Sequence, residues 1–277
     1  QWTEGTKVNV YPKKLRGNEV IINMHFPTGN TNSLHNQGTA FDYIGSLIKL
    51  GNTTYSKEQI ASKLDTLKTS VSFNSSVGSI DINIQTDEQH VLQTINFVGE
   101  LLAAPTFPQA EIEVFKRGDI ADINEQQNDP AAVALNSFRK ILYNYPTGHP
   151  KAFLESDEKI TAINNIKSET IKSLYQDHMT INNGHIAIVG NVDAQMISAQ
   201  LHTTLSPFIS KTPYEKFTTQ LKNEQGLLIS NETPDKANAQ LYIVNPITID
   251  KTHPDYLALT MANSIFGGDA FTSRIGA

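Results

Sequence analysis

The chain has 277 residues, enough for one large domain or for one domain and part of a second. Its 39% hydrophobic and 18% charged residues supply an ordinary core and exclude wholesale disorder, while a net charge of −6 without any basic cluster gives no indication of nucleic acid or an anionic membrane as partner. The absence of cysteine excludes disulfides, thiolate metal sites and a cysteine nucleophile, and no run of ~18 apolar residues predicts a membrane span.

The first elements alternate between strand and helix patterns. Residues 7–11 and 20–26 have the alternation of strands, and the polar loop 28–37 follows. Residues 38–51, GTAFDYIGSLIKLG, predict an amphipathic helix in which Gly51 supplies a left-handed C-terminal cap. The apolar residues of this helix share one face: Ala40, Ile44, Leu47 and Ile48, with Phe41 beside them.

A second helix and a hairpin come next. Ser56 and Gln59 form a capping-box pattern for a helix over residues 56–67. A strand begins at Val71, and residues 80–85 alternate isoleucine with polar residues, which predicts a strand buried on one face. A turn at residues 77–79 joins these two strands.

The middle of the chain has mainly helical patterns. Asp129-Pro130, Ser168 and Asp193 are expected to start helices, and Thr86 or Asp87 to start another. The predicted helices cover 87–102, 108–127, 129–142, 168–178 and 193–205, and a strand is predicted at 186–189. In the third of these helices Ala134, Leu135, Phe138, Ile141 and Leu142 are expected to face inward. This order predicts an α+β fold, a mostly antiparallel sheet with helices packed on one face.

The pattern of the first unit partly recurs near the end of the chain. A strand at residues 239–244 ended by Pro246, followed by an apolar helix over 256–265 closed by Gly267-Gly268, resembles the earlier strand, Pro27 and helix. We therefore expect three regions: a complete unit over 1–205, a linker over 206–223 and the truncated start of a second similar unit over 224–277. Such a start cannot cover its own sheet, so we expect the chain to be a fragment of a longer protein.

The histidines give no metal-binding pattern. No two of them are three or four residues apart, so no helical turn presents two imidazoles. His178 and His185 are the nearest pair, and the helix end and strand predicted between them argue against a shared metal. His178 falls on the apolar face of its helix and is expected to be a buried, hydrogen-bonded residue.

Other catalytic motifs are missing as well. The chain has no G-x-S-x-G elbow and no G-x-G-x-x-G loop. The carboxylates of the helix over 108–127 are interpreted as a solvated face, because unpaired acids are rarely buried. They are Glu111, Glu113, Asp119, Asp122 and Glu125.

Four segments together resemble the insulinase/pitrilysin-type zinc metallopeptidases, specifically their non-catalytic half. GTAFDYIGSLIKLGNTTYS resembles the segment that carries an inverted zinc motif, H-x-x-E-H, in catalytic units. LLAAPTFPQAEIEVFKRGDIADINEQQNDPAAVA resembles the helix pair that ends before Asp-Pro. NNGHIAIVGNVD and NSIFGGDAFTSRI resemble the strand and turn after an Asn-Asn step and the start of the next unit.

The resemblance also shows where this chain departs from the catalytic pattern. The motif's first histidine falls on Phe41, its glutamate on Ile44 and its second histidine on Gly45, and the distant glutamate ligand falls near Asp122. None of the first three has a lone pair for zinc or an ionisable group for water activation. The resemblance therefore implies no catalytic residue, no cofactor-binding residue and no metal ligand in this chain. The substrate-holding Arg…Tyr pair of the family would lie beyond Ala277.

The resemblance implies a function in proteolysis that this chain does not perform alone. One half of such a peptidase carries zinc, and the other encloses and binds the peptide substrate and packs against the zinc-bearing half. The expected partners are a catalytic half, in the same protein or in a homologous subunit, and a peptide; an exposed strand edge would bind the latter. The family's secretion in bacteria and the missing cysteines favour the periplasm.

Two alternatives remain open from the sequence. The chain resembles relatives that are structural core subunits of membrane complexes without proteolytic function, and it is also compatible with a peptide-binding module that has no partner protease. A neighbouring H-x-x-E-H motif followed by the distant glutamate would favour the peptidase.

Overall fold

The computed structural model describes residues 2, 5–219, 221, 226–233, 236–245, 247–269 and 271–276. The chain divides into two compact units, Gln1–Gln240 and Leu241–Ala277. The division expected from sequence, 1–205, 206–223 and 224–277, stays a prediction.

A five-stranded sheet is the centre of the first unit. The strand order is β1-β5-β2-β4-β3; β1 pairs with β5 in parallel, and the other pairings between described strands are antiparallel. The mostly antiparallel sheet predicted from the sequence is thus confirmed. The strands are β1 Lys7–Pro12, β2 Glu19–Pro27, β3 Ser70–Ser76, β4 Ser79–Asp87 and β5 His185–Gly190.

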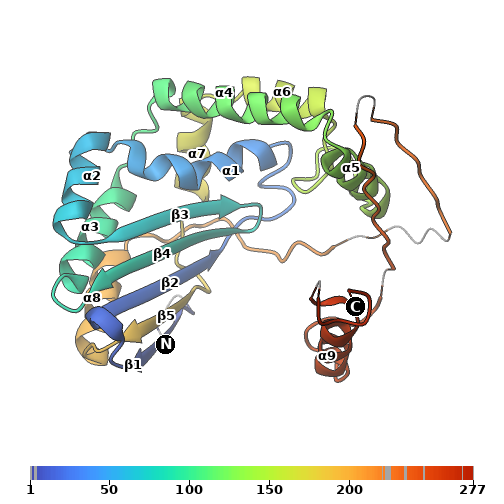
Figure 1. Cartoon of the computed structure of the whole chain (residues 1–277). Coiled ribbons are helices and arrows are strands. Elements are labelled where there is room, and N and C mark those ends of the chain that lie inside the picture. The colour runs from blue at the N-terminus through green and yellow to red at the C-terminus, as the bar shows by residue number, and fades with distance from the viewer. Residues whose placement is uncertain are drawn as a thin grey trace. The chain divides into compact units, whose positions relative to one another are not determined.

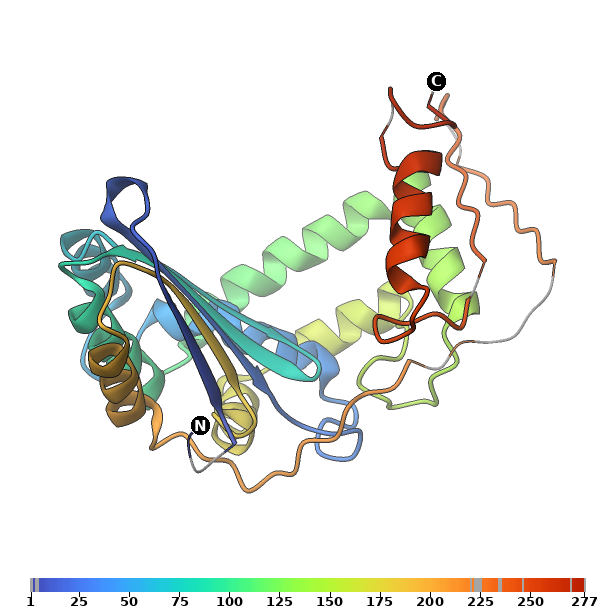
Figure 2. The same ribbon diagram turned by 90° about the horizontal axis from the view of Figure 1, so that it is seen from below.

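The two faces of the sheet differ in polarity because side chains alternate along each strand. On one face Ile80, Ile82 and Ile84 of β4 are buried together with Val20, Ile22, Met24 and Phe26 of β2. Helices cover this face of the sheet (Figures 1 and 2). The other face is polar, and on it Nδ1 of His25 lies 2.7 Å from Oδ1 of Asp81. Helices on one face, as expected for the α+β class, are therefore confirmed.

Helices of the first unit lie in two groups. One group packs on the apolar face of the sheet: α1 Gly38–Leu47, α2 Lys57–Thr66, α3 Val91–Ala103, α7 Ser168–His178 and α8 Ala194–Leu205. The second group comprises α4 Gln109–Gln126, α5 Pro130–Leu142 and α6 Ser156–Asn164. Of these, α4 and α6 lie side by side (Figure 1).

Two features of this second group differ from the sequence analysis. Helix α6 falls in a stretch where no helix was predicted. The apolar residues of α5 were expected to be inward, yet no residue of α5 is fully buried. The pattern of α5 is amphipathic, but the helix lies at the margin of the unit, where little core is available to cover it.

The helix starts show which of the N-cap residues predicted from the sequence are observed in the structure. The capping box of Ser56 and Gln59 is confirmed, as are the caps at Asp129 and Asp193. The cap predicted at Ser168 is wrong, because Lys167 is the N-cap and Ser168 Oγ instead donates to the carbonyl of Phe107 at 2.6 Å.

Two further boundaries differ from the sequence prediction. Helix α3 has His90 as its N-cap, and the carboxylate of Asp87 accepts hydrogen bonds from the backbone amides of Gln89 and His90. Helix α1 ends before the expected cap, in the 3₁₀ turn Ile48–Leu50. Gly51 follows that turn with φ 150° and ψ 144°, which is extended backbone that favours glycine rather than the predicted left-handed cap.

Part of the predicted linker packs on the first unit. The backbone amide of Glu215 donates to the carbonyl of Gly29 at 3.1 Å, and the side-chain amide of Asn30 donates to the carbonyl of Pro213 at 2.8 Å. Residues 220, 222 and 223 of that linker lie outside the described residues.

The second unit contains helix α9, Tyr256–Gly267, as predicted. The strand predicted at 239–244 is wrong, since these residues are extended without a strand partner, and Pro246 lies outside the described residues. A strand is stabilised by its neighbours, and this unit offers none in the described chain. No described helix is long and apolar enough to span a membrane.

Candidate functional site

Helix α1 is largely buried and contacts β3, α6 and α7. Phe41 and Ile44 are both 0% exposed, and Tyr43 is also buried. The structure thus places the first two positions of the degenerate motif in the hydrophobic core. We call this packed region, formed by α1, β3 and the end of α7, the closed corner.

At the closed corner the ring of Phe41 packs edge-on against the imidazole of His178, with centroids 5.6 Å apart. His178 is 2% exposed, as expected for the apolar face of α7, but its Nδ1 has no hydrogen-bond partner among the described residues. Burial lowers the pKa of His178, while the charge of Asp177 and the backbone of Ser33 act in the opposite direction. His178 is therefore held neutral.

Gly45 allows α1 to lie directly on the backbone of β3. A Cβ atom at this position would lie 2.6 Å from the Cα and carbonyl carbon of Asn74. The amide of Gly45 donates to Oγ of Ser75 at 2.9 Å, and that hydroxyl donates to the carbonyl of Asp42 at 3.0 Å. Glycine is required here because helix and strand approach too closely for any side chain.

The residues at the closed corner do not fit zinc. Phe41, Ile44 and Gly45 offer no donor atom, and β3 fills the space in which a histidine at position 45 would lie. Asp122 is exposed on α4, and the acid of α4 that reaches α1 is instead Asp119. Within the described part of the chain, no cluster of three or more His, Asp or Glu side chains is arranged to hold a metal ion.

Asp119 has a structural partner. The hydroxyl of Tyr43 donates to its carboxylate at 2.5 Å, linking α1 to α4. Burial raises the pKa of Tyr43, and the hydrogen bond and negative charge of Asp119 raise it further. Tyr43 therefore stays protonated and fixes the angle between the two helices.

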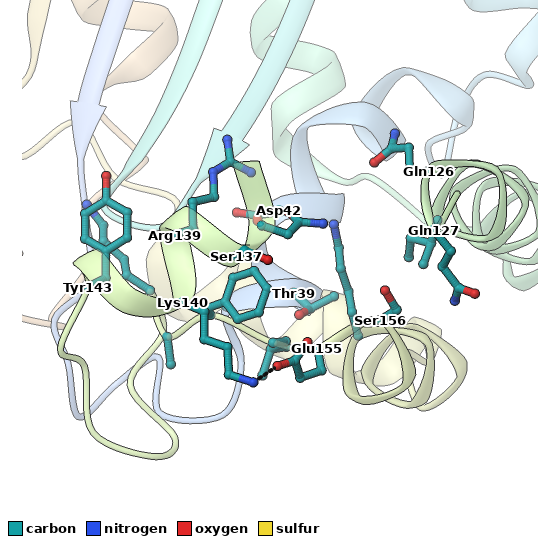
Figure 3. A pocket seen from close by; sticks show the side chains of 18 of the residues that line it. Thr39, Asp42, Gln126, Gln127, Ser137, Arg139, Lys140, Tyr143, Glu155 and Ser156 are labelled. Atoms are coloured by element: carbon teal, nitrogen blue, oxygen red, sulfur yellow. Dashed lines mark hydrogen bonds and ion pairs between the residues drawn. The ribbon is translucent and has the colours of Figure 1, made fainter. Parts of the chain in front are cut away.

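A cavity of about 580 Å³ opens beside the N-terminal half of α1. Its walls come from α1, the ends of α4 and α5, the loop over 150–155 and the start of α6. Figure 3 shows Asp42, Ser137, Arg139, Tyr143 and Gln127 around it. The volume is within the range of pockets that take organic ligands. We call it the α1–α5 cavity.

Charged side chains of the α1–α5 cavity are mostly basic. Lys140 pairs with Glu155, as the dashed line in Figure 3 marks. The ammonium of Lys151 lies 5.3 Å from the ring centroid of Phe217. Arg139 has no hydrogen bond or ion pair from its guanidinium to any described residue. The charged lining residues are Asp42, Arg139, Lys140, Lys151, Glu155 and Lys159.

Asp42 is the only charged residue of α1. Its side chain is partly open to solvent, yet the carboxyl lies inside a concave wall, and burial raises its pKa to about 6. The backbone of Val77 and the charge of Lys159 oppose this shift without cancelling it. The carboxyl of Asp42 therefore changes charge in mildly acidic solution, at the point where the closed corner meets the cavity.

A stack of aromatic rings supports the far wall of the cavity. Tyr143 and Tyr145 stack with centroids 5.9 Å apart, and Tyr145 stacks on His149 at 4.3 Å. The ring of Phe217 meets His149 edge-on at 6.1 Å. Nδ1 of His149 accepts the backbone amide of Lys151 at 3.1 Å, so the stack also positions a basic residue of the cavity.

The sequence interpretation missed the residues of this cavity. Asp42 offered a signal, because it is the single acidic residue of the predicted helix over 38–51, which is otherwise apolar or neutral except for Lys49. Arg139 and Tyr143 offered no signal, since they come together with α1 only through tertiary structure. The start of α6 was missed because its capping box uses Glu155 and Glu158 rather than a short polar cap.

Comparisons with known proteins agree with this fold. Residues 165–275 match the family model of the peptidase M16 inactive domain. A peptidase M16 inactive domain from Pseudomonas fluorescens is 20% identical with a TM-score of 0.73, over 99% of this chain and 65% of that one. A protease from Helicobacter pylori is 13% identical with a TM-score of 0.74, also over 99% and 65%.

The periplasmic protease PqqL from Escherichia coli is 17% identical, with a TM-score of 0.63, over 80% of this chain and 25% of that one. No curated protein sequence matches the chain. The chain spans about 65% of the length of the first two solved structures. At these identities the solved structures establish the shared fold.

Residues 165–275 match an M16 inactive-type domain, and the resemblance of this chain to the non-catalytic unit of the insulinase/pitrilysin-type metallopeptidases is confirmed.

Proposed function

We propose that this chain is the non-catalytic half of an insulinase/pitrilysin-like zinc metallopeptidase. It encloses and binds the peptide substrate and packs against a half that holds the zinc. The observation that supports the proposal is the contrast inside one unit: Phe41, Ile44 and Gly45, where the family resemblance would place the zinc motif, are packed in the core, while a cavity of about 580 Å³ stays open beside them. Such a unit retains a place for a peptide without the means to cleave it.

In this proposal the chain contributes binding and enclosure. The cavity supplies amide and hydroxyl groups from Gln127, Ser137 and Tyr143 for polar contacts with a peptide. The edge strands β1 and β3 are further candidates, because an extended peptide can add to an open strand edge through main-chain hydrogen bonds. Zinc and the water-activating base belong to the partner half.

The test combines this chain with a candidate catalytic half that carries H-x-x-E-H. Zinc content, co-elution on size exclusion and hydrolysis of a fluorogenic peptide would be measured for each half alone and for the mixture. We expect hydrolysis only in the mixture, with zinc bound to the other half. Stoichiometric zinc and cleavage with this chain alone would overturn the proposal.

The same measurement distinguishes the alternative of a structural or assembly core subunit. A stable complex that leaves the partner's peptide hydrolysis unchanged would favour that alternative. Peptide binding by this chain with no association at all would favour the isolated peptide-binding module.

A further inference from the structure

The α1–α5 cavity has a local charge opposite to that of the whole chain. The chain carries a formal net charge of −6, yet four of the six charged residues that line the cavity are basic. A concave site lined mainly by one sign of charge concentrates ligands of the other sign. The cavity is therefore suited to a ligand more acidic than the protein around it.

The pairing of these charges shows which group is available. Glu155 is engaged by Lys140, and Lys151 lies over the ring of Phe217. Lys159 acts on Asp42 electrostatically. Arg139 remains, in the last turn of α5, without a described hydrogen-bond or ion-pair partner for its guanidinium. A planar guanidinium matches a carboxylate through two parallel hydrogen bonds.

We propose that the α1–α5 cavity binds a carboxylate of an acidic peptide segment, with Arg139 as the residue that recognises it. This inference rests on the proposed function and specifies the class of peptide that the unit receives. The carboxylate would come from an aspartate or glutamate side chain or from a peptide C-terminus. Asparagine, serine and tyrosine side chains of the same walls would contact the neighbouring peptide groups.

The protonation state of Asp42 should affect how tightly the cavity binds a carboxylate. When its carboxyl is ionised, it adds a negative charge to the cavity that Arg139, Lys151 and Lys159 also line, and so opposes an incoming carboxylate. When it is protonated, the cavity has its largest basic surplus. Because burial raises the pKa of Asp42 to about 6, acidic peptides should bind more tightly at pH 5 than at pH 8.

The test is fluorescence anisotropy with the whole chain and three labelled peptides of one length. One contains Glu-Tyr-Glu with an amidated end, the second Gln-Tyr-Gln with an amidated end, and the third Gln-Tyr-Gln with a free carboxylate. We expect at least one carboxylate-bearing peptide to bind about tenfold more tightly than the neutral one at pH 5, the size of one charge-assisted pair at a partly solvated site. The peptide that wins identifies the source of the carboxylate.

Three variants complete the experiment. Arg139→Gln should remove the preference for the carboxylate, while Arg117→Gln, an exposed arginine of α4 outside the cavity, should keep it. Asp42→Asn should abolish the difference between pH 5 and pH 8. Equal binding of all three peptides, or an unchanged preference in Arg139→Gln, would overturn the inference while leaving peptide binding intact. If no peptide binds, both the inference and the binding role proposed above fail.

Discussion

The closed corner and the α1–α5 cavity lie on either side of the same helix, and they differ in almost every physical property. At the closed corner, Phe41 and Ile44 are fully buried and Gly45 touches the backbone of β3. In the cavity, polar and charged side chains surround open space. The first region is held by packing and tolerates little change, and the second is held by a few polar contacts. One helix thus has a tightly packed side and a side that lines an open cavity.

The largest expected effect comes from placing zinc-ligand side chains in the closed corner. We expect the triple variant Phe41→His, Ile44→Glu, Gly45→His to lose the native fold, because it buries ionisable groups and drives a side chain into β3. Gly45→Ala alone should lower the free energy of unfolding by about 1–3 kcal/mol, the usual cost of overpacking. Urea denaturation followed by circular dichroism measures both.

A histidine at Ser46, the residue after Gly45, is the control for these variants. Ser46 is exposed on α1, so Ser46→His should change the free energy of unfolding by no more than about 0.5 kcal/mol. A folded triple variant that binds zinc would show that the corner is not closed by packing.

Removing the ring of Phe41 is the next largest change. Phe41→Ala should destabilise the unit by about 3–5 kcal/mol, since a fully buried ring leaves a cavity beside His178. Phe41→Leu, which preserves most of the volume, should cost about 1 kcal/mol or slightly more. Equal effects of the two substitutions in urea denaturation would contradict the tight packing inferred here.

The two regions also differ in how far the sequence predicted them. The closed corner follows from local patterns: the apolar face of residues 38–51 and the strand expected to begin at Val71 predicted a helix and a strand that the structure contains. That Gly45 makes a close approach to Asn74 was not predictable, because it depends on two segments about thirty residues apart.

The cavity could not be predicted from the sequence for a related reason. Its walls come from four separate segments of the chain, so no single stretch has a periodic signal for it. Helix α5 showed an apolar face and was placed inward, although its burial depends on what surrounds it. Local patterns report what a segment can bury, and tertiary structure decides whether a neighbour is present to bury it.

His178 provides a pH test of the closed corner. Its pKa is lowered by burial, so between that lowered pKa and about 6.5 the unfolded chain binds a proton that the folded chain does not. Stability is therefore complete above about pH 6.5 and is lost as the pH falls. We expect His178→Phe to unfold less readily than the wild type as the pH is lowered from 7 to 5, in denaturation series at fixed steps. If the free energy of unfolding of the two proteins depends on pH in the same way, the burial of the His178 imidazole does not contribute to the pH dependence of stability.

Asp42 lies where the closed corner meets the cavity. We expect its contribution to the pH dependence of stability to be the smallest of those considered, and to have the opposite sign to that of His178. Its pKa of about 6 in the folded chain exceeds the ordinary aspartate pKa of 3.8, so the folded chain holds the proton more tightly, and the free energy of unfolding falls as the pH rises from about 4 to about 6. Asp42→Asn should match the wild type below pH 4 and be more stable above pH 6. We expect a gain of about 1 kcal/mol or less, because the side chain is partly solvated. If Asp42→Asn is instead less stable than the wild type at pH 8, the ionised carboxylate of Asp42 stabilises the folded chain. This part of the cavity wall would then contribute to stability in the same way as the closed corner.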